Sequence, residues 1–161
     1  MNTGEFLTIT GAICPEKEGI VFEQKRINYG QLNERTNRLG NALLKLGLKK
    51  SNPIALMQVN TNQCVESYFA VAKTGGIYVP LNFRAKGNEL VYMLNTAEAT
   101  TVLAGDRYLD LIDSIRSSLP TVINYISLDR PHPGWLYYED LIAGSSADEI
   151  FTEIDDSDTT I

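Results

Sequence analysis

The protein has 161 residues, of which 43% are hydrophobic and 21% are charged, and its formal net charge is −6. These totals fit a soluble globular domain, and they exclude two partner classes. The sequence has no basic footprint for nucleic acid and no apolar run near the roughly 20 residues of a membrane-spanning helix. The two cysteines, Cys14 and Cys64, match no metal or redox spacing, and the N-terminus lacks early Lys or Arg, so we expect a cytoplasmic location without a secretory signal.

The charge is unevenly distributed along the chain. Residues 1–138 hold 14 basic and 12 acidic side chains, whereas residues 139–161 hold eight acidic side chains and no basic one. We interpret residues 1–143 as an α/β subdomain. Residues 144–161 read as a solvated acidic connector that ends in the first half of a strand at Thr159–Ile161.

The chain begins with a predicted helix near Phe6–Ile13, followed by a turn at Pro15. Residues 19–23 read as a strand. Lys25 and Arg26 are expected to form the turn into a second strand at 27–29, which predicts a small N-terminal hairpin.

The first long helix has the clearest signals. Asn28 is predicted to cap it, with Gln31 reaching back in a variant of the capping box, and Gly47 to end it. Its inward face is expected to consist of Leu32, Leu39, Leu43 and Leu46. The arginines Arg35 and Arg38 are interpreted as solubilising charges rather than as a phosphate site.

Apolar strand-like runs then recur at an even spacing, with helical stretches between them. The runs begin at Ile54, Ile77, Thr100 and Val122, and the helices are expected at 62–74, about 87–96 and 107–118. Such units form parallel pairs with right-handed crossovers. The sequence therefore predicts an α/β fold with a mainly parallel sheet of about four strands and helices on both faces.

Two aromatic or apolar sets have a predicted place in this fold. Along the helix at 62–74, Val65, Phe69 and Ala72 are expected to form the inward stripe. Further on, the run Trp135–Tyr138 is expected to form a small satellite core, with a binding platform as the alternative.

Ligands of parallel sheets bind beyond the carboxyl ends of the strands. No segment at these ends forms a catalytic set, a phosphate-binding glycine loop or a metal-ligand cluster, so we predict no catalytic and no metal-binding residue. Asn82 and Arg84 are the candidates for cofactor binding, because Arg84 could pair with a phosphate or carboxylate. In the structural alternative, Asn82 holds the turn and Arg84 pairs with an acid of the protein.

Two single residues also invite a functional interpretation. His132 is the only histidine, and the sequence shows no partner that would fix it as a catalytic base. Cys64 lies near a helix start, where its thiol could be activated, but a half-buried structural thiol is the preferred interpretation.

Three ordered segments carry a family resemblance. They are INYGQL at 27–32 with RTNRL at 35–39, IAL at 54–56 with ESYFA at 66–70, and AVAKTGGIYVPLNFR at 70–84. Together they resemble the adenylate-forming superfamily of acyl-CoA synthetases, adenylation domains and luciferases. Pro80-Leu81-Asn82 is more similar to acyl-CoA ligases than to amino-acid adenylation domains, which tend to carry Asp there.

The resemblance implies an ATP-dependent carboxylate–CoA ligase that acts on a fatty acid and uses ATP, Mg²⁺ and CoA. In the family the phosphate loop, the magnesium ligand, the ribose ligand and the mobile C-terminal lysine all follow this region. We therefore expect the chain to be an N-terminal fragment that is inactive alone and binds none of these cofactors. Exposed apolar surface at the truncation would then favour self-association.

Three alternatives remain open at this point. The chain could be a freestanding interaction module with the same fold, without catalytic activity. It could belong to another adenylate-forming ligase, specific for an amino acid or an aryl acid. A complete small nucleotide-binding protein fits less well, because the sequence has no phosphate loop.

Overall fold

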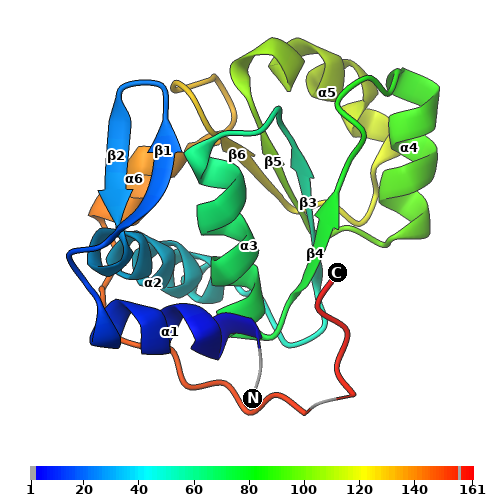
Figure 1. Ribbon diagram of the computed structural model, residues 1–161. Coiled ribbons are helices and arrows are strands. Elements are labelled where there is room, and N and C mark those ends of the chain that lie inside the picture. The colour runs from blue at the N-terminus through cyan, green and yellow to red at the C-terminus, as the bar shows by residue number, and fades with distance from the viewer. Residues whose placement is uncertain (1–2, 156) are drawn as a thin grey trace.

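The computed structural model describes residues 3–155 and 157–161. A five-stranded parallel sheet lies between two groups of helices, and a separate two-stranded antiparallel hairpin lies at one end (Figure 1). Along the chain the elements are α1 (Thr3–Ile13), β1 (Glu18–Phe22), β2 (Lys25–Asn28), α2 (Tyr29–Lys45), β3 (Pro53–Met57), α3 (Asn62–Thr74), β4 (Ile77–Pro80), α4 (Gly87–Thr96), β5 (Thr101–Ala104), α5 (Leu109–Ile115), β6 (Asn124–Ser127), β7 (Leu136–Tyr137) and α6 (Tyr138–Ala143). The predicted α/β class, the parallel sheet and the hairpin are confirmed. None of the described helices is long and apolar enough to cross a membrane.

The strand order is β4-β3-β5-β6-β7. The chain leaves β3 in one direction to form β4, and then passes over β3 to form β5 and the strands beyond it. Right-handed crossovers in opposite directions place their helices on opposite faces of a sheet. This explains why α3 lies on one face and α4 and α5 on the other (Figure 1).

Alternation along β3 divides the hydrophobic core into two. Ala55 and Met57 pack with α4 and α5, whereas Ile54 and Leu56 pack with α2, α3 and α6. A nearly unbroken apolar run is required here because both faces of the strand are covered. The fifth strand, β7, is two residues long and pairs with Ile126 and Ser127. A strand this short does not show in the regular spacing of apolar runs along the sequence.

The cap predicted for α2 is present. The Asn28 side chain accepts a hydrogen bond from the Gln31 amide at 2.8 Å, and the Gln31 side chain accepts one from the Asn28 amide at 3.0 Å. The predicted inward leucines are also confirmed. Leu39 and Leu43 are buried in one core, against which Leu46 packs, and Leu32 is buried in a smaller cluster with Leu7 and Ile27.

The inward stripe predicted for α3 is wrong in part. Val65 is 36% exposed, whereas the fully buried face carries charged side chains, above all Glu66 and Lys73. These two residues lie seven positions apart and therefore on one side of the helix. Apolar periodicity failed here because the second layer of helices buries a polar interface.

Two other predictions need correction. The hairpin turn lies at Glu23 and Gln24, and Lys25 and Arg26 pair within β2, opposite Phe22 and Val21. Glu23 takes the left-handed conformation, φ 52°, that this tight turn requires.

The predicted satellite core around Trp135 does not exist as a separate cluster. Trp135 packs on the α4–α5 side of the sheet, while Tyr138 is fully buried on the other side. The short strand β7 separates the two side chains, so the aromatic run contributes to both main cores.

Residues 145–155, which we call the strap, lie in an extended conformation across the outer helices. Two asparagines, four residues apart on α2, hold its backbone. Asn37 donates to the carbonyl of Ala147, and Asn41 donates to those of Ser146 and Asp148. Beyond the strap, the Thr160 carbonyl accepts a hydrogen bond from the Tyr78 amide at the edge of β4, at 2.9 Å.

Glu149 fixes the strap to the helices below it. Its carboxylate pairs with the Lys73 ammonium, and Thr8, Asn33 and Asn37 donate to it at 2.6 to 3.2 Å. Burial alone would raise the pKa of Glu149, but these donors more than offset it and lower the pKa to about 2. Burial lowers the pKa of Lys73 in spite of its partner. The strap therefore depends on an ion pair that shields a buried cation.

Replacing Asn28 with Ala should destabilise the protein by about 1 kcal/mol, because α2 loses the acceptor for the Gln31 amide. Urea unfolding followed by circular dichroism measures the change. The Asn41→Ala variant, which loses only strap contacts on the same helix, is the comparison. An unchanged midpoint for Asn28→Ala would contradict the role of the cap.

Replacing Glu149 with Gln should lower the free energy of unfolding by about 2 kcal/mol, more than Asn28→Ala does, because Lys73 then stays buried without a counter-charge. Glu153→Gln, an exposed change on the same strap, is the matched control and should stay within about 0.5 kcal/mol of the wild type.

The Glu149 carboxylate should also make stability depend on pH. Its pKa is lowered to about 2 from 4.5, so the stabilisation is complete above pH 4.5 and is lost as the pH falls towards 2. The Glu149→Gln variant should not lose this part of its stability as the pH falls. Parallel pH–stability curves for the two proteins would show that the ion pair does not act in this way.

Candidate functional site

The strand order identifies one point at which a ligand site is expected. The connection after β3 leads to β4 on one side of β3, and the connection after β4 leads to β5 on the other side of β3. A crevice therefore opens between the carboxyl ends of the neighbouring strands β3 and β5. Open α/β sheets bind ligands at such a switch point. This edge is therefore the candidate functional site.

Polar side chains after three strands meet at this edge. Gln58 follows β3, and its amide donates to the two carboxylate oxygens of Asp129, which comes after β6, at 3.3 and 3.1 Å. The Asp129 carboxylate also accepts the backbone N–H of Asp106, after β5, at 2.8 Å. Arg130 forms an ion pair with the Asp106 carboxylate. The loops at this edge are thus linked to one another.

Gly105 makes this arrangement possible. A Cβ atom at this position would collide with the amide group of Gln58. In its present position the Gln58 oxygen also accepts a hydrogen bond from the Val59 amide at 3.0 Å. Glycine is required at position 105 because the Gln58 side chain approaches it closely. Its φ angle is −73°, which other residues can also adopt.

A shallow pocket of about 400 Å³ lies between this edge and the hairpin. It is lined by Phe22, Glu23, Lys25, Gln58, Val59, Thr61, Gln63, Asp106, Arg107 and Asp129. Arg107 is exposed and stacks over the Tyr108 ring, 5.4 Å from its centre, and forms no ion pair within residues 3–155 and 157–161. The pocket can hold a polar or anionic group, but it contains no nucleophile paired with a base.

The sequence candidates Asn82 and Arg84 lie elsewhere, after β4, and do not line this pocket. Both are exposed. The Asn82 side chain accepts the Arg84 backbone N–H at 3.0 Å and so holds the turn, and the Arg84 guanidinium lies 5.2 Å from the centre of the Phe83 ring. A role of these residues in cofactor binding stays a prediction.

Sequence reasoning missed a buried carboxylate, Glu66. Arg35 donates to both of its oxygens at 3.0 and 3.1 Å, Asn62 donates at 2.7 Å, and the Tyr138 hydroxyl donates at 2.7 Å. Arg35 also binds Glu139 at 2.7 Å, so its interpretation as a solubilising charge is wrong. The signal available in the sequence was that Asn62 and Glu66 lie four residues apart, and therefore on one face of the same helix.

The pKa values within this cluster follow from burial and pairing. Burial would lower the pKa of Arg35, but hydrogen bonds from its guanidinium to Glu139 and Glu66 raise it above its usual value. Burial and the neighbouring Glu66 carboxylate raise the pKa of Tyr138. These two shifts keep the Arg35 guanidinium charged and the Tyr138 hydroxyl protonated at neutral pH.

His132 does have a partner in the structure, which the sequence did not reveal. Its Nε2 lies 2.8 Å from a carboxylate oxygen of Asp113, and the Trp135 indole donates to the other oxygen at 2.8 Å. Burial would raise the pKa of Asp113, but these hydrogen bonds lower it. The cluster joins the loop after β6 to α5 and does not line the candidate pocket.

Cys64 is half-buried, and its Sγ lies 3.2 Å from the Val59 carbonyl, which it contacts as a donor. This supports the structural interpretation of the thiol. Among the described residues, no three His, Cys, Asp or Glu side chains lie close enough to hold a metal ion.

Residues 10–158 match the family of AMP-binding enzymes. The chain belongs to this family. A long-chain-fatty-acid–CoA ligase from Thermus thermophilus is 31% identical over 93% of the chain, and an indoleacetate–CoA ligase from Aromatoleum aromaticum is 28% identical over 90%. The chain spans about 28% of the length of each of these two relatives.

Solved structures agree with this assignment. A fatty acyl CoA synthetase from Mycobacterium tuberculosis superposes with a TM-score of 0.89 at 26% identity, over 98% of this chain and 31% of that chain. An anthranilate CoA ligase in complex with anthranoyl-AMP superposes with a TM-score of 0.94 at 24% identity, over 98% of this chain and 31% of that chain, which shows the shared fold. The resemblance to adenylate-forming enzymes is thereby confirmed.

The family is named for enzymes that bind AMP, a nucleotide with a phosphate group. The described residues do not fit a triphosphate with its metal ion, because the carboxyl edge offers Arg107 but neither a glycine-rich loop nor a metal-ligand cluster. The polar groups of the edge are bound to one another.

Replacing Gly105 with Ala should displace the Gln58 amide and break its hydrogen bonds to Asp129 and Val59. Because the amide is at the end of a flexible side chain, we expect a modest loss of about 1 kcal/mol, with backbone NMR shifts concentrated after β3, β5 and β6. Gly87→Ala, at the start of α4, is the control and should leave these shifts unchanged. Unperturbed shifts in Gly105→Ala would contradict the linkage of the three loops.

Proposed function

We propose that the chain is the N-terminal α/β part of an ATP-dependent carboxylic acid–CoA ligase. In that reaction a carboxylate oxygen attacks the α-phosphorus of ATP and pyrophosphate leaves. The sulfur of CoA then attacks the acyl carbon and AMP leaves. The observation that carries the proposal is the family match over residues 10–158, together with relatives that are named acid–CoA ligases.

Within such an enzyme, the chain would supply a scaffold and one wall of a binding site. The described loops at the carboxyl edge are fixed by hydrogen bonds among Gln58, Asp106 and Asp129, which suits a preformed wall. We propose that the groups for adenylation, including those for ATP and Mg²⁺, lie in other parts of the enzyme. The two cysteines are free, in keeping with the proposed cytoplasmic location.

A fatty acid is the proposed substrate. Support comes from the relatives named for long-chain fatty acids and fatty acyl groups, at 31% and 26% identity. Other relatives are named for indoleacetate and for crotonobetaine or carnitine. Competition among palmitate, indoleacetate and crotonobetaine in the enzyme that contains this chain is the test, and preference for either of the last two would reject the fatty acid.

The purified 161-residue chain should show no carboxylate-dependent exchange of pyrophosphate into ATP. The positive control is the whole Thermus thermophilus ligase, and palmitate, indoleacetate and crotonobetaine are the acids offered. Exchange that rises with any of these acids would mean that the described edge, or the residues around it, performs adenylation alone.

A freestanding interaction module is the second candidate. The observation in its favour is that both faces of the sheet are already covered, with a buried core on each side. Reading the gene beyond the codon for Ile161 separates the two candidates. A frame that continues into a Ser/Thr/Gly-rich loop supports the ligase, whereas a stop codon supports the module.

A further inference from the structure

A pocket of about 380 Å³ lies at the amino ends of β6 and β7, at the end of the sheet opposite to the candidate functional site. Its lining comes from the ends of α2 and α5 and from the starts of the two strands: Leu46, Arg116, Ile123, Asn124, Tyr125, Gly134, Trp135 and Leu136. None of these residues lines the candidate pocket at the carboxyl edge. Neither the family match nor the proposed ligase reaction assigns a role to this second pocket.

Most of the lining is apolar, and part of it faces solvent. Ile123 is 70% exposed and Leu136 is 37% exposed. Trp135 is half-buried and packs edge-on against the Tyr125 ring, with the ring centres 5.2 Å apart. A pocket of this volume that is bordered by exposed apolar side chains and aromatic rings is typical of a small-molecule site.

Arg116 adds a charge to this apolar lining. Among the described residues that line the pocket it is the one with a charged side chain, and that side chain is 42% exposed. Its guanidinium carbon lies 3.9 Å from the centre of the Tyr125 ring, and Nη1 donates to the Gly134 carbonyl at 3.3 Å. These contacts hold the guanidinium beside the pocket while it stays accessible from solvent.

Asp113 is only a weak partner of this cation. Arg116 Nη1 lies 3.8 Å from a carboxylate oxygen of Asp113, which is beyond hydrogen-bond distance. The same oxygen already accepts the Trp135 indole N–H at 2.8 Å, and the other oxygen lies 2.8 Å from Nε2 of His132. A partly exposed contact of this length contributes little, and Nε and Nη2 of the guanidinium carry further N–H donors. Arg116 can therefore still bind a ligand.

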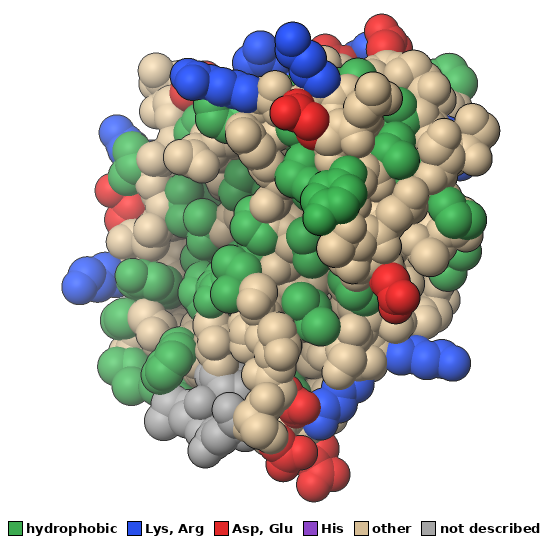
Figure 2. Space-filling view, turned by 90° about the vertical axis from the view of Figure 1, so that its right-hand side faces the viewer, with side chains coloured by type: hydrophobic (Ala, Val, Ile, Leu, Met, Phe, Trp, Pro, Cys, Tyr) green, Lys and Arg blue, Asp and Glu red, His purple; other side chains and the backbone are tan. Residues whose placement is uncertain are grey.

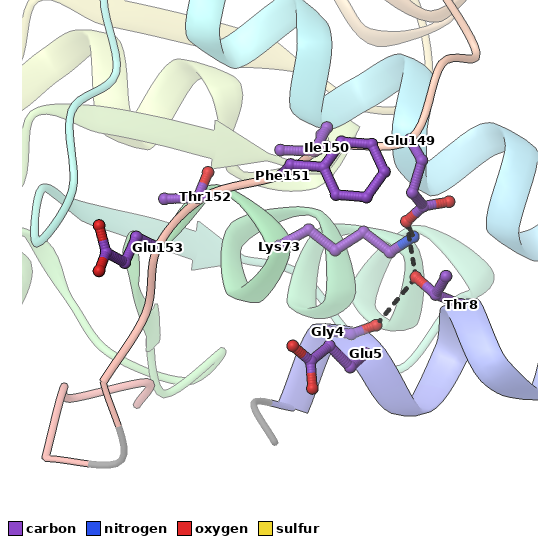
Figure 3. A pocket seen from close by; sticks show the side chains of 9 residues that line it. All are labelled: Gly4, Glu5, Thr8, Lys73, Glu149, Ile150, Phe151, Thr152 and Glu153. Carbon is purple, nitrogen blue, oxygen red and sulfur yellow. Dashed lines mark hydrogen bonds and ion pairs between the residues drawn. The ribbon is translucent and has the colours of Figure 1, made fainter.

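The groove between α1 and the strap lacks an accessible cation of this kind (Figure 3). Lys73, the basic side chain in its lining, is buried and bound to Glu149. A charge that is buried and paired is not available to select a ligand, whereas the exposed Arg116 is.

We propose that the pocket at the amino ends of β6 and β7 binds a monocarboxylic acid with an apolar body. The carboxylate pairs with Arg116, and the apolar body lies against Ile123 and Leu136. A cation beside apolar side chains suits an anionic amphiphile, whereas a basic ligand would meet no acidic side chain among the described lining residues. An anionic bilayer suits the site less well, because a single cation adds little attraction and the chain has a net charge of −6.

The fluorescence of Trp135 tests the proposal, because this residue is the only tryptophan of the protein and it lines the pocket. The probe is octanoate, titrated without ATP or CoA. We expect a saturable change that weakens as salt rises, with octanoate binding about fivefold more tightly than octanamide, which has the same chain length without the charge. Acetate, which has almost no apolar body, and octylammonium, which Arg116 repels, should cause no saturable change. Octanamide that binds as tightly as octanoate would overturn the proposal.

Charge variants at an exposed position show whether the carboxylate lies beside Ile123. Ile123→Lys should bind octanoate about tenfold more tightly than Ile123→Asp, through attraction in one variant and repulsion in the other. Tyr92→Lys and Tyr92→Asp introduce the same two charges at a side chain that is also 70% exposed but lies outside the pocket, on α4, and they should bind octanoate equally. Equal affinities of the two Ile123 variants would contradict the proposed site.

Arg116→Gln separates binding of the carboxylate from a purely structural role of Arg116. The variant should bind octanoate about fivefold more weakly and octanamide as the wild type does, since only the charged ligand uses the guanidinium. Arg107→Gln, in the candidate pocket, should leave the affinity for octanoate unchanged. Equal weakening of both ligands in Arg116→Gln would mean that Arg116 only supports the local structure. Circular dichroism checks that the variants fold.

Other occupants of the pocket give distinct results, and each would overturn the proposal. A dimer of the 161-residue chain that dissociates in Ile123→Asp, seen by sedimentation, would make the pocket a contact between copies. Octanoate binding by the 161-residue chain but not by a longer protein that contains it, measured by calorimetry, would mean that the protein's own residues fill the pocket. None of these measurements depends on adenylation, so failure of this site and failure of the proposed function are distinguishable.

Discussion

The structure depends on two ion pairs of opposite polarity along the buried side of α3. Glu66 is fully buried and bound by Arg35 of α2, while Lys73, seven residues later, is 4% exposed and bound by Glu149 of the strap. A carboxylate and an ammonium removed from water are each costly unless paired. Sliding α2 along α3 would separate Glu66 from Arg35, and it would separate Lys73 from the Asn33 and Asn37 side chains, to which it donates at 2.7 Å. These contacts therefore favour a single register of the two helices.

The same two pairs decide which segments outside the sheet are held in place. Arg35 connects α2 to both Glu66 and Glu139, and so fixes the position of α6 beside α2. Lys73 draws Glu149 inwards, and the asparagines of α2 then bind the strap by its backbone. Exposed apolar side chains remain on the outer surface, including Tyr92 and Phe151, and hydrophobic groups gather on the face seen in Figure 2.

Much of the fold followed from local sequence signals. The cap of α2 involves Asn28 and Gln31, three residues apart, and the helix and strand spacing after Ile54 needs only neighbouring segments. The errors involve partners far away in the sequence. Arg35 binds residues 31 and 104 positions later, and the segment around Trp135 is divided between two cores by a two-residue strand. The choice of Asn82 and Arg84 followed from the rule for strand ends, and their role in cofactor binding stays a prediction.

The acidic side chains of the carboxyl edge bind groups of the protein itself. Asp129 accepts hydrogen bonds from Gln58 and from the Asp106 amide, and Asp106 pairs with Arg130, so the acids of this edge already serve the protein itself. A carboxylate that is used in this way is a poor general base, because protonation would break the bonds that position it. Arg107 is the exception, since its charge is unpaired within the described chain. Fixed loops, together with Arg107 and with Lys25 on the hairpin side of the same pocket, can orient an anionic ligand.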